Sequence, residues 1–422
     1  MQISERRRVS SRPIKVDPSR PRVLLVTPQP FFEDRGTPIA VAFTARALAE
    51  SGYEVDLLAF PIGKTVSIPG VNIERCRNPF GFQSVPVGFS LRKALLDVSL
   101  LRRFEQLLTT RRYDAVHAVE EAACMAAVLC PLHKLPFVYD MASAIPEQLS
   151  EHPILGLQPL QALARMTERR VLDRAAHVVC SGGLAGRVRD LAPHTAVTEW
   201  RYPVFETTPD HRAVATLRER QQIAVSDRVL LYIGNFARYQ GIDLLLDAFA
   251  IAAAADSRLL LVCVGAADAE QALETEMRLP ANLRHRVRIL PRENRPLVQV
   301  WLALADCLVS LRPSGDNIPL KLFEYMAARK PIVASRGPAH QTILNDDRAF
   351  LCELDARGIA DGITRVFADP ARARRVADTA GDFASRNFSW SRFRQLVSGI
   401  YGNLPGTDLA HEAQRSVSAS RR

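Results

Sequence analysis

Residues 314–335 read SGDNIPLKLFEYMAARKPIVAS and combine a polar loop, a helix and a strand. Apolar residues recur at helical spacing after Pro319, and Pro331 ends this pattern before the strand-forming residues 332–334. Proline suits the first turn of a helix, and a helix N-terminus behind a glycine-containing loop attracts anions. Lys321 adds a positive charge there. The stretch therefore predicts a loop–helix–strand unit with an anion site at the start of its helix.

Two carboxylates, Asp316 and Glu324, lie beside this predicted anion site. Because carboxylates repel phosphate, they need another kind of partner. A carboxylate can accept two hydrogen bonds from the hydroxyls of a sugar or a ribose. A ligand with both phosphate and hydroxyl groups, such as a nucleotide sugar, would satisfy all of these residues. The alternative is an ordinary amphipathic helix of an α/β domain with solvated charges.

The composition predicts a two-domain globular protein. A chain of 422 residues exceeds a single compact core, and 47% hydrophobic with 24% charged residues is typical of soluble proteins. No apolar run approaches the ~20 residues that span a bilayer. The basic start of the chain lacks the apolar segment of a secretory signal and is expected to be a disordered tail.

The net charge limits the kinds of binding partner, and the cysteines indicate the redox compartment. The formal charge of +10 fits nucleic acid, an anionic membrane surface or phosphorylated substrates. Because no zinc-finger or RNP signature is present, no nucleic-acid partner is expected. Seven scattered cysteines without a C-x-x-C pair indicate reduced thiols in a cytoplasmic protein, and no metal site is expected.

Short apolar runs alternate with helical patterns along the chain. The runs predict strands at 22–27, 55–60, 114–119, 136–140, 177–181, 229–234, 259–265, 287–290, 307–310 and 332–334. The intervening patterns predict helices at 39–51, 91–112, 145–149, 157–173, 211–225, 241–254, 296–305 and 388–401. This alternation predicts an α/β fold with two Rossmann-like, doubly wound domains facing a cleft. The expected divisions are a disordered basic tail 1–20, a first domain 21–200, a second domain 201–387, a crossing helix 388–402 and a disordered tail 403–422.

The predicted helix 91–112 has an apolar side and a strongly basic side. Phe80 and Phe82 precede it in a loop-like context. A basic amphipathic helix beside exposed aromatic residues is typical of a membrane-surface element. The alternative is a helix that packs in the core and leaves its arginines solvated.

The first half offers further candidates near expected strand ends. Gly36-Thr37 precedes the first helix and would give backbone N–H groups to a ligand, or form a plain tight turn. Glu120 follows a strand, and as an acidic residue it also suits a helix N-terminus. Asp140 ends the next strand, and His117 is either near the site or buried within its strand.

These features together resemble the GT-B glycosyltransferases, and among them the retaining family 4 type, over roughly residues 22–401. The resemblance rests on Arg35-Gly36-Thr37-Pro38 before a helix, on 232–235 with 239–243, on 319–325 and on Phe388-Ser389-Trp390. Its E-x7-E motif falls on Asp316 and Glu324. The resemblance implies transfer of a sugar from a nucleotide diphosphate sugar to an acceptor hydroxyl with retention, without metal or other cofactor.

The resemblance also implies roles for residues. Glu324 would bind the ribose, Asp316 the hydroxyls of the sugar, and the N–H groups of Asn317 and Ile318 the diphosphate, whose charge Lys321 and Arg312 would neutralise. The other implied donor-binding residues are Gly36, Thr37, Gly234, Asn235, Arg238 and Gln240. The expected catalytic residues are Asp316, Glu324 and Glu120, and His117 and Asp140 are expected on the acceptor side.

Departures from the family pattern keep alternatives open. Many members carry an Arg and a Lys where this chain has Asn235 and Gln240, and a His where it has Val119. A non-catalytic GT-B-like partner subunit is therefore a second reading, and a phosphate-ester or epimerase enzyme on the same architecture is a third. For the enzyme, the expected acceptor is a glycan or a lipid-linked glycan in cell-surface or exopolysaccharide synthesis. The expected location is cytoplasmic, with segment 91–112 against the inner membrane face.

Overall fold

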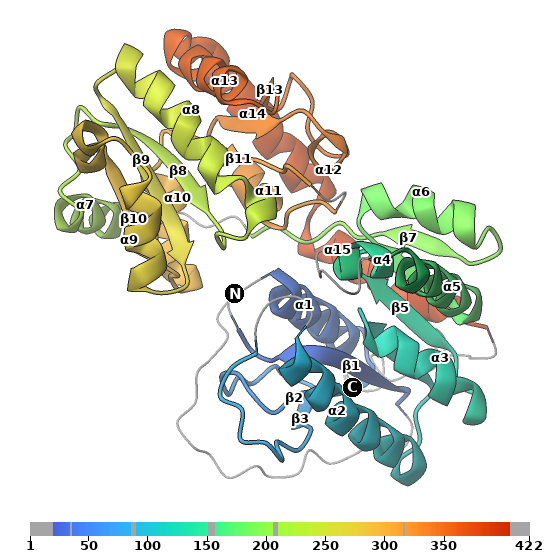
Figure 1. Cartoon of the computed structure of the whole chain (residues 1–422). Helices are drawn as coiled ribbons and strands as arrows, with labels where there is room; N and C mark the ends of the chain where they lie inside the picture. Colours follow the sequence, from blue (N-terminus) through green and yellow to red (C-terminus); the bar gives the residue numbers. More distant parts are fainter. Residues whose placement is uncertain are drawn as a thin grey trace. The chain divides into compact units, whose positions relative to one another are not determined.

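A computed structural model describes residues 20–33, 36–85, 90–150, 157–205, 210–314 and 317–405 (Figure 1). The chain forms two compact units. Unit 1 comprises Met1–Tyr202 and Trp390–Arg422, and unit 2 comprises Pro203–Ser389. The two tails that were expected to be disordered lie mostly outside the described residues. The second tail was placed too early, because Leu404 is 3% exposed and still packs against the fold.

Unit 1 contains a seven-stranded parallel sheet of order β3-β2-β1-β4-β5-β6-β7. Its strands are β1 (Arg22–Pro30), β2 (Glu54–Phe60), β3 (Val71–Arg75), β4 (Ala115–Val119), β5 (Phe137–Met141), β6 (His177–Cys180) and β7 (Val197–Glu199). Its helices are α1 (Gly36–Glu50), α2 (Leu91–Thr110), α3 (Ala122–Leu132), α4 (Ile145–Ser150), α5 (Gln158–Arg174), α6 (Gly182–Leu191) and α15 (Trp390–Gly402). The strand order reverses between β1 and β4, and in such sheets ligands bind outside the carboxyl ends at this point.

Unit 2 contains a six-stranded parallel sheet of order β10-β9-β8-β11-β12-β13. Its strands are β8 (Arg228–Ile233), β9 (Leu259–Ala266), β10 (Val287–Pro291), β11 (Cys307–Ser310), β12 (Ile332–Ser335) and β13 (Phe350–Cys352). Its helices are α7 (His211–Arg220), η1 (Arg238–Gln240), α8 (Ile242–Ala255), α9 (Ala269–Met277), η2 (Ala281–Arg286), α10 (Arg295–Leu304), α11 (Lys321–Ala327), α12 (Pro338–Gln341), α13 (Ala356–Ala368) and α14 (Pro370–Asn387).

Apart from the additional edge strand β7 of unit 1, the two sheets have the same strand order. In unit 2, helix α8 lies beside α13 (Figure 1). The switch point of unit 2 lies between β8 and β11. Both sheets have the doubly wound order that the alternation of strands and helices predicts. The predicted α/β fold with two Rossmann-like domains is confirmed.

Several predicted element ends were wrong. Strand β1 continues to Pro30, because its pairing with β2 shifts between Thr27 and Pro30 and so accommodates the prolines. Helix α1 begins at Gly36 instead of residue 39, and α7 ends at Arg220 instead of residue 225. Helix α11 begins at Lys321, so Pro319 precedes the helix, and Glu324 lies within its first turn.

Helix α2 is a core element of unit 1. Its inward residues are at most 7% exposed: Leu96, Leu100, Phe104, Leu107 and Leu108. Several of its basic side chains form ion pairs within the unit, such as Lys93 with Glu121 and Arg103 with Glu74. The core-packing alternative is therefore confirmed for the buried face. The N-terminal end of α2 remains exposed, with Leu91 75% and the preceding Phe80 51% accessible. None of the described helices is both long and apolar enough to cross a membrane.

Helix α15 belongs to unit 1 although it follows unit 2 in sequence, and it packs against α1. Its Phe393 ring lies 5.3 Å from Trp200 and 6.5 Å from Phe43, measured between centroids. The hydroxyl of Tyr401 lies 2.9 Å from Nδ1 of His117 in β4. Aromatic packing and this buried hydrogen bond attach the last helix to the first sheet.

Candidate functional site

Two glycines bring strands β8 and β9 into close contact at their carboxyl ends in unit 2. Gly234 and Gly265 have φ of 151° and 138°. A Cβ on Gly265 would lie 2.0 Å from the carbonyl oxygen of Gly234, and one on Gly234 would lie 2.8 Å from the Tyr232 hydroxyl. Both glycines adopt a backbone conformation that larger residues rarely take, so the two strand ends pack closely at the edge where ligands of such sheets bind.

The loop after β8 is held by an internal turn. The Asn235 side chain accepts a hydrogen bond from the N–H of Ala237 at 3.1 Å and donates one to the Tyr239 hydroxyl at 3.3 Å. This asparagine–backbone turn leads into η1, which contains Arg238 and Gln240. The predicted donor-binding residues Gly234, Asn235, Arg238 and Gln240 thus lie in one loop at the carboxyl end of β8.

Lys321 of α11 meets this loop. Its Nζ donates to Oε1 of Gln240 at 2.9 Å and lies 4.0 Å from the centroid of the Tyr232 ring. Burial, assisted by the charge of Arg312, lowers the pKa of Lys321 to about 7. A lysine with this pKa gains charge when an anion binds beside it.

Arg312 follows β11 and lies over the ring of Tyr239 in the same loop. Its guanidinium is 4.7 Å from the Tyr239 ring centroid and donates to the Asn317 side chain. Its backbone N–H donates to Oγ of Ser335 at 3.0 Å. Ile318 is 9% exposed. Asp316 lies outside the described residues.

The carboxylate of Glu324 forms an ion pair with Arg295, the first residue of α10. Both side chains keep 21% of their exposure, so a ligand can still reach them. Sequence reasoning missed Arg295. The only local indication is that Arg295 lies at a predicted helix start, between Asn294 and Pro296. That position does not reveal its partner Glu324, which lies 29 residues away.

Glu120 of unit 1 lies at the carboxyl end of β4 with φ of 49°, an uncommon value for a residue other than glycine. It was expected to start a helix, but α3 begins at Ala122 because Glu120 adopts this left-handed conformation. Its Oε2 accepts a hydrogen bond from Gln29 at 2.8 Å. Burial and then the neighbouring Glu121 raise the pKa of Glu120 to about 7. Sequence reasoning missed Gln29.

His117 and Asp140 are enclosed in unit 1, at 0% and 4% exposure. Nε2 of His117 lies 3.3 Å from Oδ2 of Asp140, whose Oδ1 accepts from Nε1 of Trp200 at 3.0 Å. The expectation that both face an acceptor needs correction, since these partners and Tyr401 already occupy their polar atoms.

Gly36 and Thr37 form the first turn of α1. No atom lies within 4 Å of a Cβ built on Gly36, so packing does not require glycine there. Its backbone N–H belongs to a helix N-terminus, which has no intrahelical partner.

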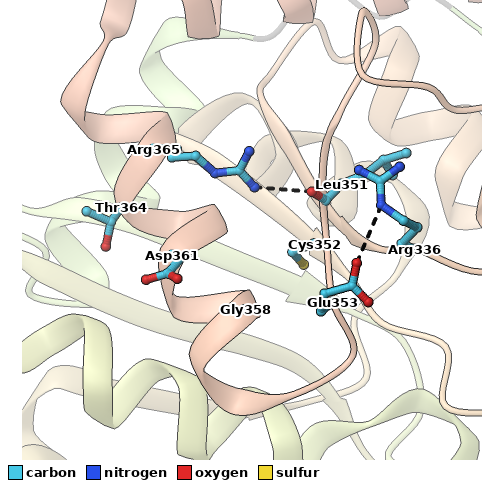
Figure 2. Close-up of a pocket in the computed structure, with 8 residues that line it drawn as sticks. All are labelled: Arg336, Leu351, Cys352, Glu353, Gly358, Asp361, Thr364 and Arg365. Carbon is cyan, nitrogen blue, oxygen red and sulfur yellow. Dashed lines mark hydrogen bonds and ion pairs between the residues drawn. The ribbon is translucent and has the colours of Figure 1, made fainter.

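A separate cavity of about 480 Å³ lies in unit 2 between β13 and α13. Figure 2 shows Arg365 on α13 reaching Leu351 and Arg336 reaching Glu353 across its walls. None of the predicted site residues lines this cavity. Within the described residues, no group of three or more His, Cys, Asp or Glu side chains is placed to hold a metal ion.

Comparison with known proteins follows the division of the chain. Residues 35–221 match the family described as Glycosyl transferase 4-like domain, and residues 227–369 match Glycosyl transferases group 1. The two matches together cover more than three quarters of the chain.

Individual relatives agree with these matches. The D-inositol 3-phosphate glycosyltransferase of Corynebacterium aurimucosum is 24% identical over 415 residues, covering 90% of this chain and 94% of the relative. The N-acetyl-alpha-D-glucosaminyl L-malate synthase of Bacillus anthracis is 28% identical over 193 residues, covering 45% of this chain and 49%, about half, of that relative. The solved structure of Anabaena Alr3699/HepE in complex with UDP-glucose is 17% identical with a TM-score of 0.70, covering 91% of this chain and all of that one. The fold and both family matches show that the chain belongs to the GT-B glycosyltransferases of group 1, family 4 type.

Proposed function

We propose that this glycosyltransferase moves a sugar from a nucleotide diphosphate sugar to an acceptor hydroxyl with retention of the anomeric configuration. In this step the bond between the anomeric carbon and the diphosphate oxygen breaks, and the acceptor oxygen bonds to the same face of that carbon. The acceptor proton passes to the leaving diphosphate or to a protein carboxylate. A role in cell-surface or exopolysaccharide synthesis is the setting that we favour.

The observation that carries this proposal is the pair of cations at the carboxyl edge of unit 2. Lys321 contacts Gln240 and Arg312 lies over Tyr239, so both cations border the loop after β8, close to Gly234. Cations and backbone N–H groups there would neutralise a diphosphate and take the part that a metal ion has in other enzymes. The Anabaena relative, whose structure contains UDP-glucose, supports a nucleotide-sugar donor.

The remaining donor contacts follow from the same geometry. Glu324, oriented by Arg295, would accept hydrogen bonds from the ribose hydroxyls. Asp316 would bind hydroxyls of the sugar, and the N–H groups of Asn317 and Ile318 would contact the diphosphate. In unit 1, Glu120 combines an unusual backbone conformation with a pKa near neutrality, and we assign it to the acceptor proton.

We further propose that the acceptor is a glycan or a lipid-linked glycan at an anionic membrane surface. The exposed N-terminal end of α2 supports this proposal. Phe80 stacks on Phe82, and the guanidinium of Arg92 lies 5.7 Å from the Phe82 ring centroid. Arg77, three residues before Phe80, and Arg102 on α2 are exposed as well. This combination of aromatic and basic side chains fits a negatively charged lipid surface.

A non-catalytic partner subunit is the second candidate function. It is favoured by the amides of Asn235 and Gln240 at positions where many family members carry cations, and by Val119, which is 0% exposed. Such a subunit would bind nucleotide or glycan without turnover.

One experiment separates the two candidates. UDP, GDP and ADP are screened by thermal shift for the nucleoside diphosphate that stabilises the protein most. Release of that nucleoside diphosphate is then measured from its glucose, mannose and N-acetylglucosamine conjugates. We expect binding and release for the wild type, and at least tenfold weaker binding for Glu324→Ala, because the proposed hydrogen bonds from the ribose to a charged group are lost. Binding without release would favour the partner subunit, and equal binding by the variant would contradict the donor-site assignment.

A further inference from the structure

A buried histidine lies behind the candidate donor site of unit 2. His340 of α12 is 0% exposed, and its ring contacts the carboxyl ends of two neighbouring strands. Nδ1 lies 2.9 Å from the carbonyl oxygen of Ser335, and Nε2 lies 3.0 Å from Oγ of Ser310. Ser310 ends β11 and Ser335 ends β12, and both serines are 0% exposed. The imidazole therefore ties the two strand ends together.

The partners define the state of the ring. A carbonyl oxygen only accepts hydrogen bonds, so Nδ1 carries the hydrogen, and Nε2 of a neutral ring accepts from the Ser310 hydroxyl. Burial, with a smaller contribution from the charges of Lys321 and Arg312, lowers the pKa of His340 to about 4. A neutral ring adds no third positive charge beside these two cations.

The same network reaches Arg312. Oγ of Ser335 accepts the backbone N–H of Arg312 at 3.0 Å, while the carbonyl of Ser335 accepts from His340. Ser335 thus connects the buried imidazole of His340 to the backbone of Arg312. From this backbone the Arg312 side chain extends over Tyr239 to the side chain of Asn317. The direction of the guanidinium depends on a backbone that the imidazole holds.

We propose that His340 is a positioning residue for nucleotide diphosphate binding, acting through Ser335 on Arg312. This inference rests on the donor site proposed above. Loss of the imidazole leaves the hydroxyl of Ser310 and the carbonyl of Ser335 without their buried partner, so the end of β12 can shift. Small displacements of a charged group weaken the electrostatic stabilisation that it provides.

The test is a double-mutant cycle on nucleotide affinity. The variants are His340→Phe, Arg312→Ala and the double variant, and the ligand is whichever of UDP, GDP and ADP raises the melting temperature of the wild type most. We expect His340→Phe to weaken binding about tenfold, as the loss of one buried, oriented hydrogen bond does. In the Arg312→Ala background the same change should weaken binding less than twofold, because the residue that it positions is gone.

Matched variants separate positioning from stability. Val333→Ala removes methyl groups from the same strand at a fully buried site, so it lowers the melting temperature while its affinity should stay unchanged. His340→Asn, which can still donate to Ser335, should recover part of the affinity. If His340→Phe fails to fold, Ser335→Ala removes the acceptor of the Arg312 N–H and serves in the same cycle.

The outcomes are distinct. The positioning role would be overturned if His340→Phe weakened nucleotide binding equally in the wild-type and Arg312→Ala backgrounds. An equally large loss of nucleotide affinity in Val333→Ala would overturn it as well. Unchanged affinity in Arg312→Ala would overturn it too, since the residue to be positioned would not bind the ligand. If the wild type binds none of the three nucleotides, the proposed donor site itself fails.

Discussion

Nζ of Lys321 lies 2.9 Å from Oε1 of Gln240, so a cation from α11 meets the loop position where many family members carry a lysine. The sequence alone indicated a missing charge at position 240. In the folded unit, a positive group lies beside that position after all, brought there by a helix that starts 81 residues later. The contact explains how a glutamine at 240 is compatible with a diphosphate site.

Lys321 should make nucleotide binding pH-dependent. Its pKa is lowered to about 7, chiefly by burial, so above neutral pH a diphosphate must draw a proton onto the lysine as it binds. We expect the affinity of the wild type to fall between pH 7.5 and 9 by roughly tenfold, in a range where the nucleotide phosphates no longer titrate. Calorimetry at pH 8 in buffers of different ionisation enthalpy should show uptake of up to about one proton.

Two variants control this prediction. Lys321→Arg keeps a charge at all these pH values, so its affinity should vary less with pH. Lys321→Met should bind weakly at every pH.

The effect of Lys321 on folding stability has the opposite sign to its effect on nucleotide binding. A lysine with a lowered folded pKa disfavours folding increasingly as pH falls from about 10 toward 7, so the methionine variant should melt higher than the wild type at pH 7. A wild type with flat affinity and no proton uptake would exclude this role for Lys321.

Arg295 should control discrimination between ribose and deoxyribose. It forms an ion pair with Glu324, the residue assigned to the ribose hydroxyls. Arg295→Gln would leave the carboxylate less firmly oriented, so the preference for a nucleoside diphosphate over its 2′-deoxy analogue should shrink several-fold. The matched control is Arg278→Gln, which breaks an ion pair with Asp243 elsewhere in unit 2. Loss of affinity for both analogues in equal proportion would assign Arg295 to the phosphates instead.

Glu120 should produce a rise in turnover with pH. Its pKa is raised to about 7 by burial and by Glu121, so the carboxylate form that accepts a proton accumulates above neutrality. We expect kcat to increase through pH 7 in the wild type, and Glu120→Gln to lose at least a hundredfold with a flat profile. Gln29→Leu removes a hydrogen bond that lowers this pKa, so its profile should move to higher pH. Full activity of Glu120→Gln would remove this residue from the mechanism.

The exposed end of α2 should bind anionic vesicles. Phe80→Ser and Leu91→Ser remove side chains that are 51% and 75% exposed, so folding should tolerate both. We expect several-fold weaker co-sedimentation with phosphatidylglycerol vesicles at low salt, and no binding to phosphatidylcholine alone. Leu132→Ser changes a side chain that is 74% exposed on α3 and should bind like the wild type. Equal effects of all three substitutions, or no wild-type binding, would contradict a specific lipid surface here.

The sequence predicted the helices and strands better than it predicted the contacts between distant side chains. Buried parallel strands are continuous apolar runs, which a local window detects, so the inner strands of both sheets followed from the alternation. The short edge strands β3, β7 and β13 were not predicted. The pairs that shape the candidate site join residues far apart: 91 residues for Gln29–Glu120, 29 for Arg295–Glu324 and 30 for Ser310–His340. No local pattern encodes such pairs. The left-handed conformation of Glu120 was missed because acidic residues also suit helix starts, which was the local interpretation.

Tyr401 should hold α15 on unit 1. Nε2 of His117 donates to the Asp140 carboxylate, which leaves Nδ1 to accept from the Tyr401 hydroxyl at 2.9 Å. Tyr401→Phe would leave this buried nitrogen without a hydrogen-bond donor, which should lower the free energy of unfolding by about 1–2 kcal/mol. We expect faster amide hydrogen exchange in α15 and a lower melting temperature. Tyr53→Phe is the matched control, because the neighbouring Tyr53 hydroxyl is buried without a hydrogen-bond partner among the described residues. That variant should be neutral or slightly stabilising, and equal destabilisation by both would mean that ring packing, not the hydrogen bond to His117, attaches the helix.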